Sequence, residues 1–212
     1  MGGQYSQALG MHEIALVCVL ALEGHDSLHV AASYNNIGNV HNNQGKYEEA
    51  LELYTKSLDI MTRIYGGDNH PDVATSFINI GAVYAEKGDF ENALVQYQKG
   101  LEIKTRVLGS DHPDVAKSYL GIGNVYYSQG QYERALEYYQ KGLEIDIKVS
   151  GQDHPRPSVA DSKYNLALLH KKRKETDIAR QLFLECEQIY TIVYGPHHRK
   201  TVDAVRQASL CV

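Results

Sequence analysis

A segment of about 42 residues recurs along this chain and constrains its fold more than any other feature. Three clear copies, GKYEEALELYTKSLDI, GDFENALVQYQKGLEI and GQYERALEYYQKGLEI, begin at Gly45, Gly88 and Gly130, and weaker copies begin at Gly3 and Lys174. One alanine of each copy marks the period, with spacings of 42 to 44 residues: Ala8, Ala50, Ala93, Ala135 and Ala179. Such a period is typical of repeat proteins, in which each unit packs mainly on its neighbours.

Each repeat is predicted to be a pair of helices. A second block precedes the segment above: VAASYNNIGNVHNNQ from Val30, VATSFINIGAVYAEK from Val73, VAKSYLGIGNVYYSQ from Val115, and a degenerate copy from Val159. Within both blocks apolar and small residues recur three and four positions apart, which predicts one buried face per helix. The glycine of the first helix is expected to face the aromatic residue of the second, Gly81 beside Tyr97 and Gly123 beside Tyr139, because small and large side chains then fill the space together.

The pattern resembles the tetratricopeptide repeat. The resemblance rests on Tyr/Phe-x-x-Ile-Gly-x-x-Tyr in the first helix, then Gly-x-Tyr/Phe-x-x-Ala-Leu and Tyr-x-x-Gly in the second. The long repeat and its Gly-x-Asp-His-Pro-Asp-Val-Ala link are similar to the kinesin light chain type, and the resemblance spans residues 3 to about 209. It implies an all-α fold, a right-handed α-solenoid of antiparallel helix pairs whose first helices line a concave groove.

We expect one repeat array over residues 1–212. Its parts are a half repeat at about 1–28, four repeats at 29–71, 72–113, 114–157 and 158–200, and a capping or truncated first helix at 201–212. Gly3 matches the glycine between the two helices of a repeat, so the first repeat lacks its first helix. Either the half repeats cap the array or the chain is a piece of a longer solenoid, and we favour a piece.

The resemblance also implies a binding surface, because peptide contacts in the resembled family come from outward positions of the first helices. The corresponding residues here are Ala32, Asn35, Asn39, Asn42, Thr75, Ile78, Ala82, Ala85, Lys117, Leu120, Asn124, Tyr127, Asp161, Tyr164, Leu168 and Lys171. These positions differ between repeats, which fits a specialised surface; the alternative is that they are unconstrained solvent positions. An apolar stripe of Ile78, Leu120, Tyr164 and Leu168 favours binding.

The groove does not match the acidic cargo motifs of the resembled family. Kinesin light chains carry paired asparagines in each first helix and a basic groove, whereas here only Asn35-Asn36 keeps the pair. Lys117 and Lys171 are the only cations at the mapped positions. The sequence therefore favours an apolar or helical ligand in the groove.

The sequence predicts a protein that binds other proteins and is not an enzyme. It has no P-loop, no His-Glu-x-x-His and no nucleophile elbow, so we assign no catalytic residues and no cofactor. The leading interpretation is an interaction module or adaptor that holds a protein or peptide in its groove. The alternative is an architectural subunit or spacer of a larger assembly that uses its ends or its convex face.

Other classes of site and location are not favoured. His70, His112 and His154 occupy the same loop of successive repeats, which keeps them too far apart for a metal site. A net charge of −5 argues against nucleic-acid binding. The longest apolar run, Ile14 to Leu22, is shorter than the roughly 20 residues that span a membrane. Three cysteines without close spacing favour a reducing compartment such as the cytoplasm.

Two short motifs leave alternatives open. The basic run Lys171-Lys172-Arg173-Lys174 is interpreted as a solvated helix end or as a patch for nuclear import or an acidic partner. The first six residues fit an N-myristoylation pattern, although the repeat already accounts for Gly3 and Tyr5.

Overall fold

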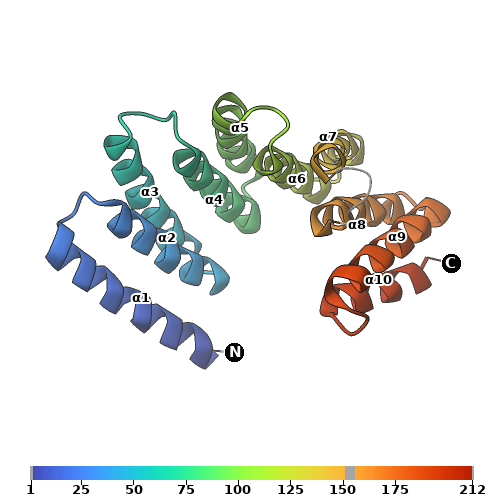
Figure 1. The fold of residues 1–212 in the computed structure, drawn as a ribbon, viewed down its shortest axis with the longest axis horizontal. Coiled ribbons are helices and arrows are strands. Elements are labelled where there is room, and N and C mark those ends of the chain that lie inside the picture. The colour runs from blue at the N-terminus through green and yellow to red at the C-terminus, as the bar shows by residue number, and fades with distance from the viewer. Residues whose placement is uncertain (1, 151–155, 212) are drawn as a thin grey trace. The chain divides into compact units, whose positions relative to one another are not determined.

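A computed structural model describes residues 2–150 and 156–211 (Figure 1). This part of the chain forms ten α-helices and no strand, so the predicted all-α fold of paired helices is confirmed. The helices are α1 (Gly2–Glu23), α2 (Leu28–Asn43), α3 (Tyr47–Ile64), α4 (Pro71–Lys87), α5 (Phe90–Leu108), α6 (Pro113–Ser128), α7 (Tyr132–Ser150), α8 (Pro157–Lys172), α9 (Thr176–Tyr194) and α10 (Arg199–Ser209).

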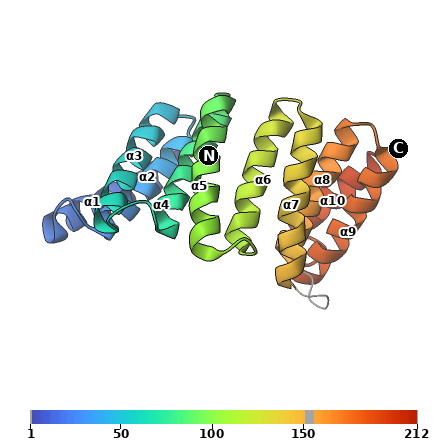
Figure 2. The same ribbon diagram turned by 90° about the horizontal axis from the view of Figure 1, so that it is seen from above.

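The chain divides into two compact units, Met1–Leu108 and Gly109–Val212, which we call unit 1 and unit 2. In unit 1, α2 pairs with α3 and α4 with α5, while α1 packs on α2 and α3 on α4 (Figures 1 and 2). In unit 2, α6 pairs with α7 and α8 with α9, while α7 packs on α8 and α9 on α10. Each helix therefore contacts mainly the helices next to it in sequence, as a repeat array requires.

Histidine side chains cap three of the first helices. The Nδ1 atoms of His70 and His112 accept hydrogen bonds from the backbone N–H two residues later, at 3.2 and 3.1 Å. His198 does the same at the start of α10, at 3.3 Å. His154 lies outside the described residues. The repeated loop histidine thus satisfies a backbone donor that the helix leaves free, and no three metal-binding side chains gather anywhere in the described ranges.

The predicted contact between glycine and aromatic side chain is confirmed. A Cβ atom added at Gly81 would lie 3.2 Å from the Tyr97 ring and 3.2 Å from the carbonyl oxygen of Ala93. At Gly123 it would lie only 2.6 Å from the Tyr139 ring. The first and second helices of these repeats therefore lie so close together that only a glycine, which has no side chain, fits at these two positions.

The turn inside the last helix pair carries an unfavourable backbone conformation. Lys174 has φ of 64°, in the left-handed region, where the equivalent residues Gly45, Gly88 and Gly130 have φ of 75°, 84° and 73°. This conformation costs a residue with a Cβ atom about 1–2 kcal/mol, whereas glycine adopts it freely.

Lys174→Gly is therefore expected to raise the free energy of unfolding by about 1 kcal/mol or slightly less, because the flexible unfolded chain offsets part of the gain. Denaturant unfolding of the variant and the parent measures the change. Gly130→Lys is the matched reverse substitution and should lower stability; equal stability of all three proteins would contradict the explanation.

A buried carboxyl group joins α7 to α8. Asp146 is 5% exposed and accepts a hydrogen bond from the Ser162 hydroxyl at 2.6 Å. Burial raises the pKa of Asp146, against the smaller effects of hydrogen bonds from Ser162 and Ser158; the nearby charge of Asp161 raises it further and that of Lys117 lowers it. The folded chain thus holds this proton more tightly than the unfolded chain does.

The stability that Asp146 contributes is full below its unfolded pKa and is lost as the pH rises through its folded pKa. Asp146→Asn removes this titration while keeping an acceptor for Ser162. We expect the variant to gain stability relative to the parent as the pH rises from about 4, the ordinary pKa of an aspartate, towards neutrality. Thermal unfolding across this range measures the difference, and a difference that does not change with pH would contradict the assignment.

Candidate functional site

In unit 1, several predicted groove residues are engaged in contacts within their own repeat. The Oδ1 atom of Asn39 accepts a hydrogen bond from the Tyr54 hydroxyl at 2.6 Å. Burial raises the pKa of Tyr54 to about 12, so this hydroxyl keeps its proton and remains a donor. The Oδ1 atoms of Asn35 and Asn42, by contrast, are buried with no hydrogen-bond partner among the described residues. Unsatisfied acceptors of this kind are costly and suit an additional donor.

The same tyrosine–asparagine bond recurs in unit 2, and the sequence explains where it is absent. The Tyr139 hydroxyl donates to Asn124 at 2.7 Å. In the last pair Leu168 replaces the asparagine, and the facing aromatic residue is Phe183, which has no hydroxyl. Asn39 and Asn124 therefore support the helix pair as well as lying at outward positions.

Two residues of the predicted apolar stripe pack on glycines of the second helix. A Cβ atom at Gly100 would lie 2.8 Å from the Ile78 side chain, and one at Gly142 would lie 3.1 Å from Leu120. At the equivalent position of other repeats, Ser57 donates to the carbonyl oxygen of Ala31 at 2.8 Å, and Cys186 donates to that of Ala160 at 3.1 Å. The stripe thus covers small residues and is not wholly free for a ligand.

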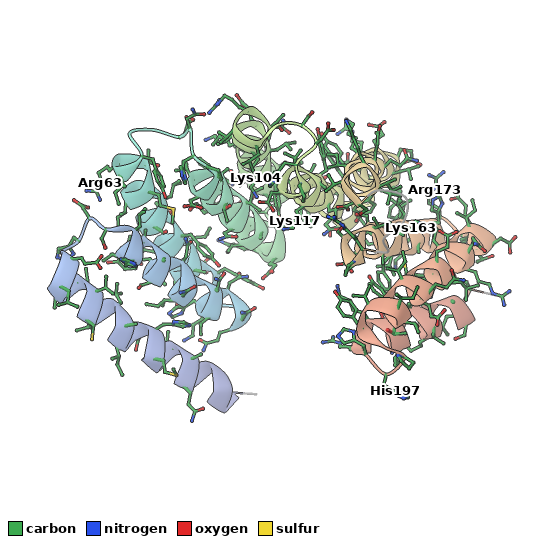
Figure 3. The ribbon with its side chains drawn as sticks, in the orientation of Figure 1. Arg63, Lys104, Lys117, Lys163, Arg173 and His197 are labelled. Atoms are coloured by element: carbon green, nitrogen blue, oxygen red, sulfur yellow. The ribbon has the colours of Figure 1, made fainter. Side chains whose placement is uncertain are left out.

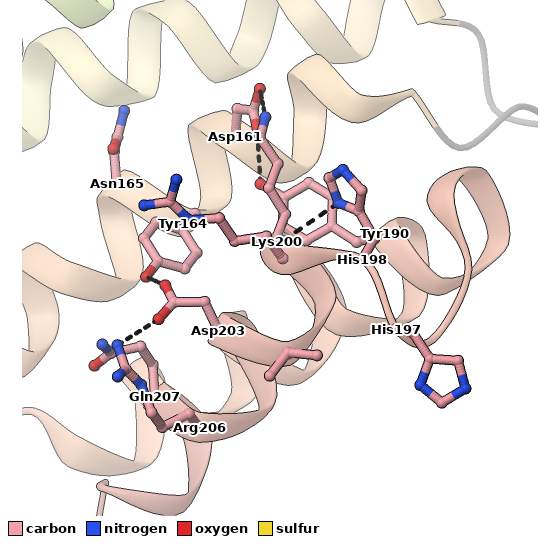
Figure 4. Close-up of a pocket in the computed structure, with 12 residues that line it drawn as sticks. Asp161, Tyr164, Asn165, Tyr190, His197, His198, Lys200, Asp203, Arg206 and Gln207 are labelled. Carbon is pink, nitrogen blue, oxygen red and sulfur yellow. Dashed lines mark hydrogen bonds and ion pairs between the residues drawn. The ribbon is translucent and has the colours of Figure 1, made fainter. Parts of the chain in front are cut away.

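A large cleft lies in unit 2 between α8 and α10 (Figure 4). Its volume is about 1160 Å³. The lining residues are Asp161, Tyr164, Asn165, Tyr190, His197, His198, Arg199, Lys200, Val202, Asp203, Arg206 and Gln207. Of the predicted groove residues of α8, Asp161 and Tyr164 line this cleft directly, while Leu168 packs on the adjoining hydrophobic cluster.

One side of the cleft is built on Tyr164. Its hydroxyl donates to Asp203 of α10, and its ring contacts Phe183 edge-on with centroids 5.2 Å apart. Arg206 also donates to Asp203, at 2.6 Å. The hydrogen bond from Tyr164 lowers the pKa of Asp203, with Arg206 acting in the same direction. Asp203 is therefore a carboxylate at neutral pH that fixes α10 against α8.

The other side is built on Asp161. It accepts hydrogen bonds from the Tyr190 hydroxyl and from the Lys200 ammonium group, the latter at 2.7 Å (Figure 4). The Lys200 nitrogen also lies 5.5 Å from the centroid of the Tyr190 ring. Lys171, another predicted groove residue, donates to Gln207 of α10 at 2.9 Å. These bridges hold polar donors in fixed places along the cleft.

The remaining predicted residues do not enter this cleft. Lys117 pairs with Asp114 of its own helix at 2.8 Å, and the Thr75 hydroxyl donates to the carbonyl oxygen of Pro71 at 3.0 Å. The half-buried Ala82 lies on α4, and the half-buried Tyr127 packs against Tyr132 at 5.7 Å between ring centroids. None of these contacts prevents the outward positions from meeting a ligand.

Sequence reasoning missed the contribution of α10. Its alignment as a first helix places Asp203 where α4 has Thr75, and Arg206 where α4 has Ile78. Mapping the outward positions of the first helices onto α10 therefore identifies residues that line the cleft. The sequence prediction restricted that mapping to the four complete repeats, although it aligned the last segment with a first helix, either capping or truncated.

In the fourth repeat, an ion pair between the two helices takes the place of the contact between an aromatic ring and a lysine. Lys163 of α8, which is labelled in Figure 3, donates to Glu185 of α9 at 2.7 Å. In α2 and α4 the residue at this position is Tyr34 or Phe77, and its ring receives Lys56 or Lys99 of the paired helix at 5.9 and 5.6 Å. The two positions therefore contact each other in each of these three pairs, with different but complementary chemistry.

The chemistry of these residues suits binding. Burial raises the pKa of the Cys186 thiol to about 12, which keeps it protonated and unreactive at neutral pH. The two carboxylates of the cleft are each held by a tyrosine and a cation, an arrangement that orders side chains.

The described helices also fall short of what a bilayer requires, since no one of them combines the length and the apolar composition of a membrane span.

Comparisons with known proteins agree with this architecture. The family model for the tetratricopeptide repeat matches residues 2–63, 29–106 and 72–148, and a second model of the same description matches residues 159–200. No curated protein matches the chain.

Solved structures share the fold. The chain is similar to BtubC (BKLC) of P. vanneervenii, with a TM-score of 0.71, 17% identity, and coverage of 98% of this chain and 90% of that one. It is also similar to a Podosopora anserina protein described as a putative kinesin light chain with nearly identical TPR-like repeats, with a TM-score of 0.69, 20% identity, and coverage of 91% and 90%. A single-substitution form of that protein is similar as well, with a TM-score of 0.71, 20% identity, and coverage of 91% of this chain and 89% of that one. The chain belongs to the tetratricopeptide repeat family, and its fold is that of kinesin light chain-like repeat proteins.

Proposed function

We propose that this chain is a non-enzymatic interaction module that binds a partner polypeptide along the outward positions of its first helices. The observation that supports this most directly is the cleft between α8 and α10, which contains residues from two first helices. Tetratricopeptide repeats generally serve protein–protein interaction. The predicted positions on α6 in unit 2, and separately those on α2 and α4 in unit 1, are proposed as further contacts.

The size of the cleft favours a polypeptide over a small molecule. Its volume of about 1160 Å³ lies near the upper end of the roughly 300–1,000 Å³ of small-molecule sites and leaves room for several side chains of a peptide. The lining combines Tyr164 and Val202 with polar groups of Asn165, Lys200 and Arg206. A short helix or extended segment that presents an apolar side chain with polar groups beside it matches this lining.

Two of the three lysine and arginine side chains that line the cleft are paired internally, which limits how much acidic charge a partner can present there. Lys200 and Arg206 are already neutralised by Asp161 and Asp203. A second acidic group would have to displace these internal partners, whereas a neutral polar group can share their remaining hydrogen-bonding capacity.

A selection from a random peptide library against the purified chain tests the proposal. Peptides that bind are measured by calorimetry against the parent and two matched variants. Arg199→Glu reverses an exposed charge in the cleft, and Arg180→Glu reverses an exposed charge on α9 outside it. We expect Arg199→Glu to change the affinity about tenfold or more and Arg180→Glu to leave it unchanged, because only the former lies at the bound segment.

Chemical-shift mapping of the same peptides locates the contact independently. Perturbations are expected on α8 and α10, with further ones on the outward faces of α2, α4 or α6. Peptides that bind without affecting any first helix, and that respond equally to both arginine variants, would contradict groove binding and favour the convex face.

A further inference from the structure

Two helices present apolar faces that no described element covers. On α1, Ile14 is 68% and Val17 is 66% exposed, in a helix that packs on α2. On α10, Val202 is 53% and Val205 is 50% exposed, in a helix that packs on α9. Apolar side chains this exposed, at adjacent turns of one helix, indicate a surface that meets another apolar surface.

The repeat alignment shows what kind of helix each face lacks. The helix α1 aligns with the second helices, so its Ala15 corresponds to residues that are buried under a first helix in every other pair: Ser57, Gly100, Gly142 and Cys186. Ala15 itself is exposed. The face of α1 is therefore shaped to receive a first helix.

The converse holds for α10, which aligns with the first helices. Its Val202 corresponds to residues that are fully buried under a second helix: Ala31, Ala74, Ala116 and Ala160. Its Ser209, which is exposed, corresponds to the buried small residues Gly38, Gly81, Gly123 and Ala167. The face of α10 is shaped to receive a second helix.

We propose that copies of this chain associate head to tail, with α10 of one copy packed against α1 of the next to complete a helix pair. The template for the contact is the pairing of α4 with α5 within one chain. Each contact leaves one α1 face and one α10 face free at the ends of the assembly, so further copies add by the same contact.

The side chains that would meet are matched. The positions occupied by Phe77 and Lys99 in the α4–α5 pair, and by Lys163 and Glu185 in the α8–α9 pair, contact each other across the two helices. In α10 and α1 the corresponding residues are Val205 and Ile14. Both are apolar, and Ile14 replaces a lysine that is found in three other second helices (Lys56, Lys99 and Lys141). A change from lysine to isoleucine at an otherwise solvated position is explained if Val205 of another copy covers it.

The charges favour this pairing over the alternatives. Glu13 and Glu23 are the acidic residues of α1, which has no lysine or arginine. The helix α10 carries Arg199, Lys200 and Arg206 against Asp203, and Asp161 of α8 offsets Lys200 as well, which leaves a net charge of +1. An α1–α10 contact therefore brings opposite net charges together, whereas α1 against α1 or α10 against α10 would bring like charges together.

Charged substitutions at Ile14 and Val205 test the contact, because neither residue lines the cleft of unit 2. Val205→Lys and Ile14→Glu reproduce, across two copies, the lysine–glutamate pair of α8 and α9. The parent is expected to show an average mass in sedimentation experiments that rises with concentration. Each variant alone should associate about tenfold more weakly or worse, since a charge would face an apolar residue.

Mixing the two variants is the decisive measurement. In the mixture the introduced lysine of one copy meets the introduced glutamate of another at one contact, and the parent residues meet at the next. Association should therefore return to nearly the parent level. Circular dichroism checks that both variants keep the parent's helix content, which the exposure of both sites predicts. Ala15→Arg is a third blocking variant, at an exposed site that would face Arg206 of the other copy.

Three results would overturn the proposal. One is a parent chain that stays monomeric up to about 1 mM, which would leave the faces for a different protein or for further repeats. Another is association that none of the three variants weakens. The third is a mixture that associates no better than its components. Peptide binding by Arg199→Glu is measured at concentrations at which the chain is monomeric. The result for the proposed peptide-binding function therefore does not depend on whether copies associate.

Discussion

Gly123→Leu is expected to lower the free energy of unfolding by about 1–3 kcal/mol or more. An added Cβ atom alone would lie 2.6 Å from two carbons of the Tyr139 ring, so either the ring or the helix α6 must move. Movement of the ring also breaks the hydrogen bond from the Tyr139 hydroxyl to Asn124, at 2.7 Å. Thermal and urea unfolding of the variant and the parent measure the loss.

Gly10→Ala is the matched control for this substitution. Gly10 also lies within a helix, but a Cβ atom there would have no neighbour within 4 Å. Alanine should therefore stabilise the helix by up to about 1 kcal/mol, as its intrinsic propensity predicts. If Gly123→Leu unfolds like the parent, the faces assigned to α6 and α7 are wrong, and the groove positions deduced from them are wrong as well.

Much of the fold could be predicted because the repeats constrain one another. The glycine of the first helix and the aromatic residue of the second recur at fixed spacing, and the contacts of Gly81 and Gly123 follow from that recurrence. The capping role of His70 and His112 did not follow, because a histidine before a proline carries no unique signal. Only the side-chain orientation in the structure shows that Nδ1 faces the free N–H group.

The candidate site was predicted less completely, because it depends on contacts between residues that differ from repeat to repeat. Asn124 was identified as an outward residue, but its bond to Tyr139 needs the geometry of both helices. Tyr164 was assigned to an outward position as well, yet its partner Asp203 lies on the last helix, whose outward positions were not mapped. Side chains that vary between repeats lack the internal comparison that located the core.

Leu120 illustrates the difference. From sequence it belongs to the groove, which predicts that Leu120→Ala leaves the fold nearly intact and weakens binding. In the structure its side chain covers Gly142 and packs on the cluster around Tyr139 and Leu166. We therefore expect Leu120→Ala to lower the free energy of unfolding by about 2 kcal/mol or more, because truncation leaves a cavity between α6 and α7.

A double-mutant cycle with Gly142→Ala decides how the two residues depend on each other. Alone, Gly142→Ala is expected to destabilise, because the new methyl group would lie 3.1 Å from Leu120 and 3.2 Å from the carbonyl oxygen of Ala116. With Leu120→Ala present, the first of these contacts disappears while the second remains. The destabilisation by Gly142→Ala should then fall by about 1 kcal/mol, within the range for contacting residues. Additive effects in urea unfolding would show that Leu120 does not cover Gly142 in solution, and would return Leu120 to the groove as a residue free to bind a partner.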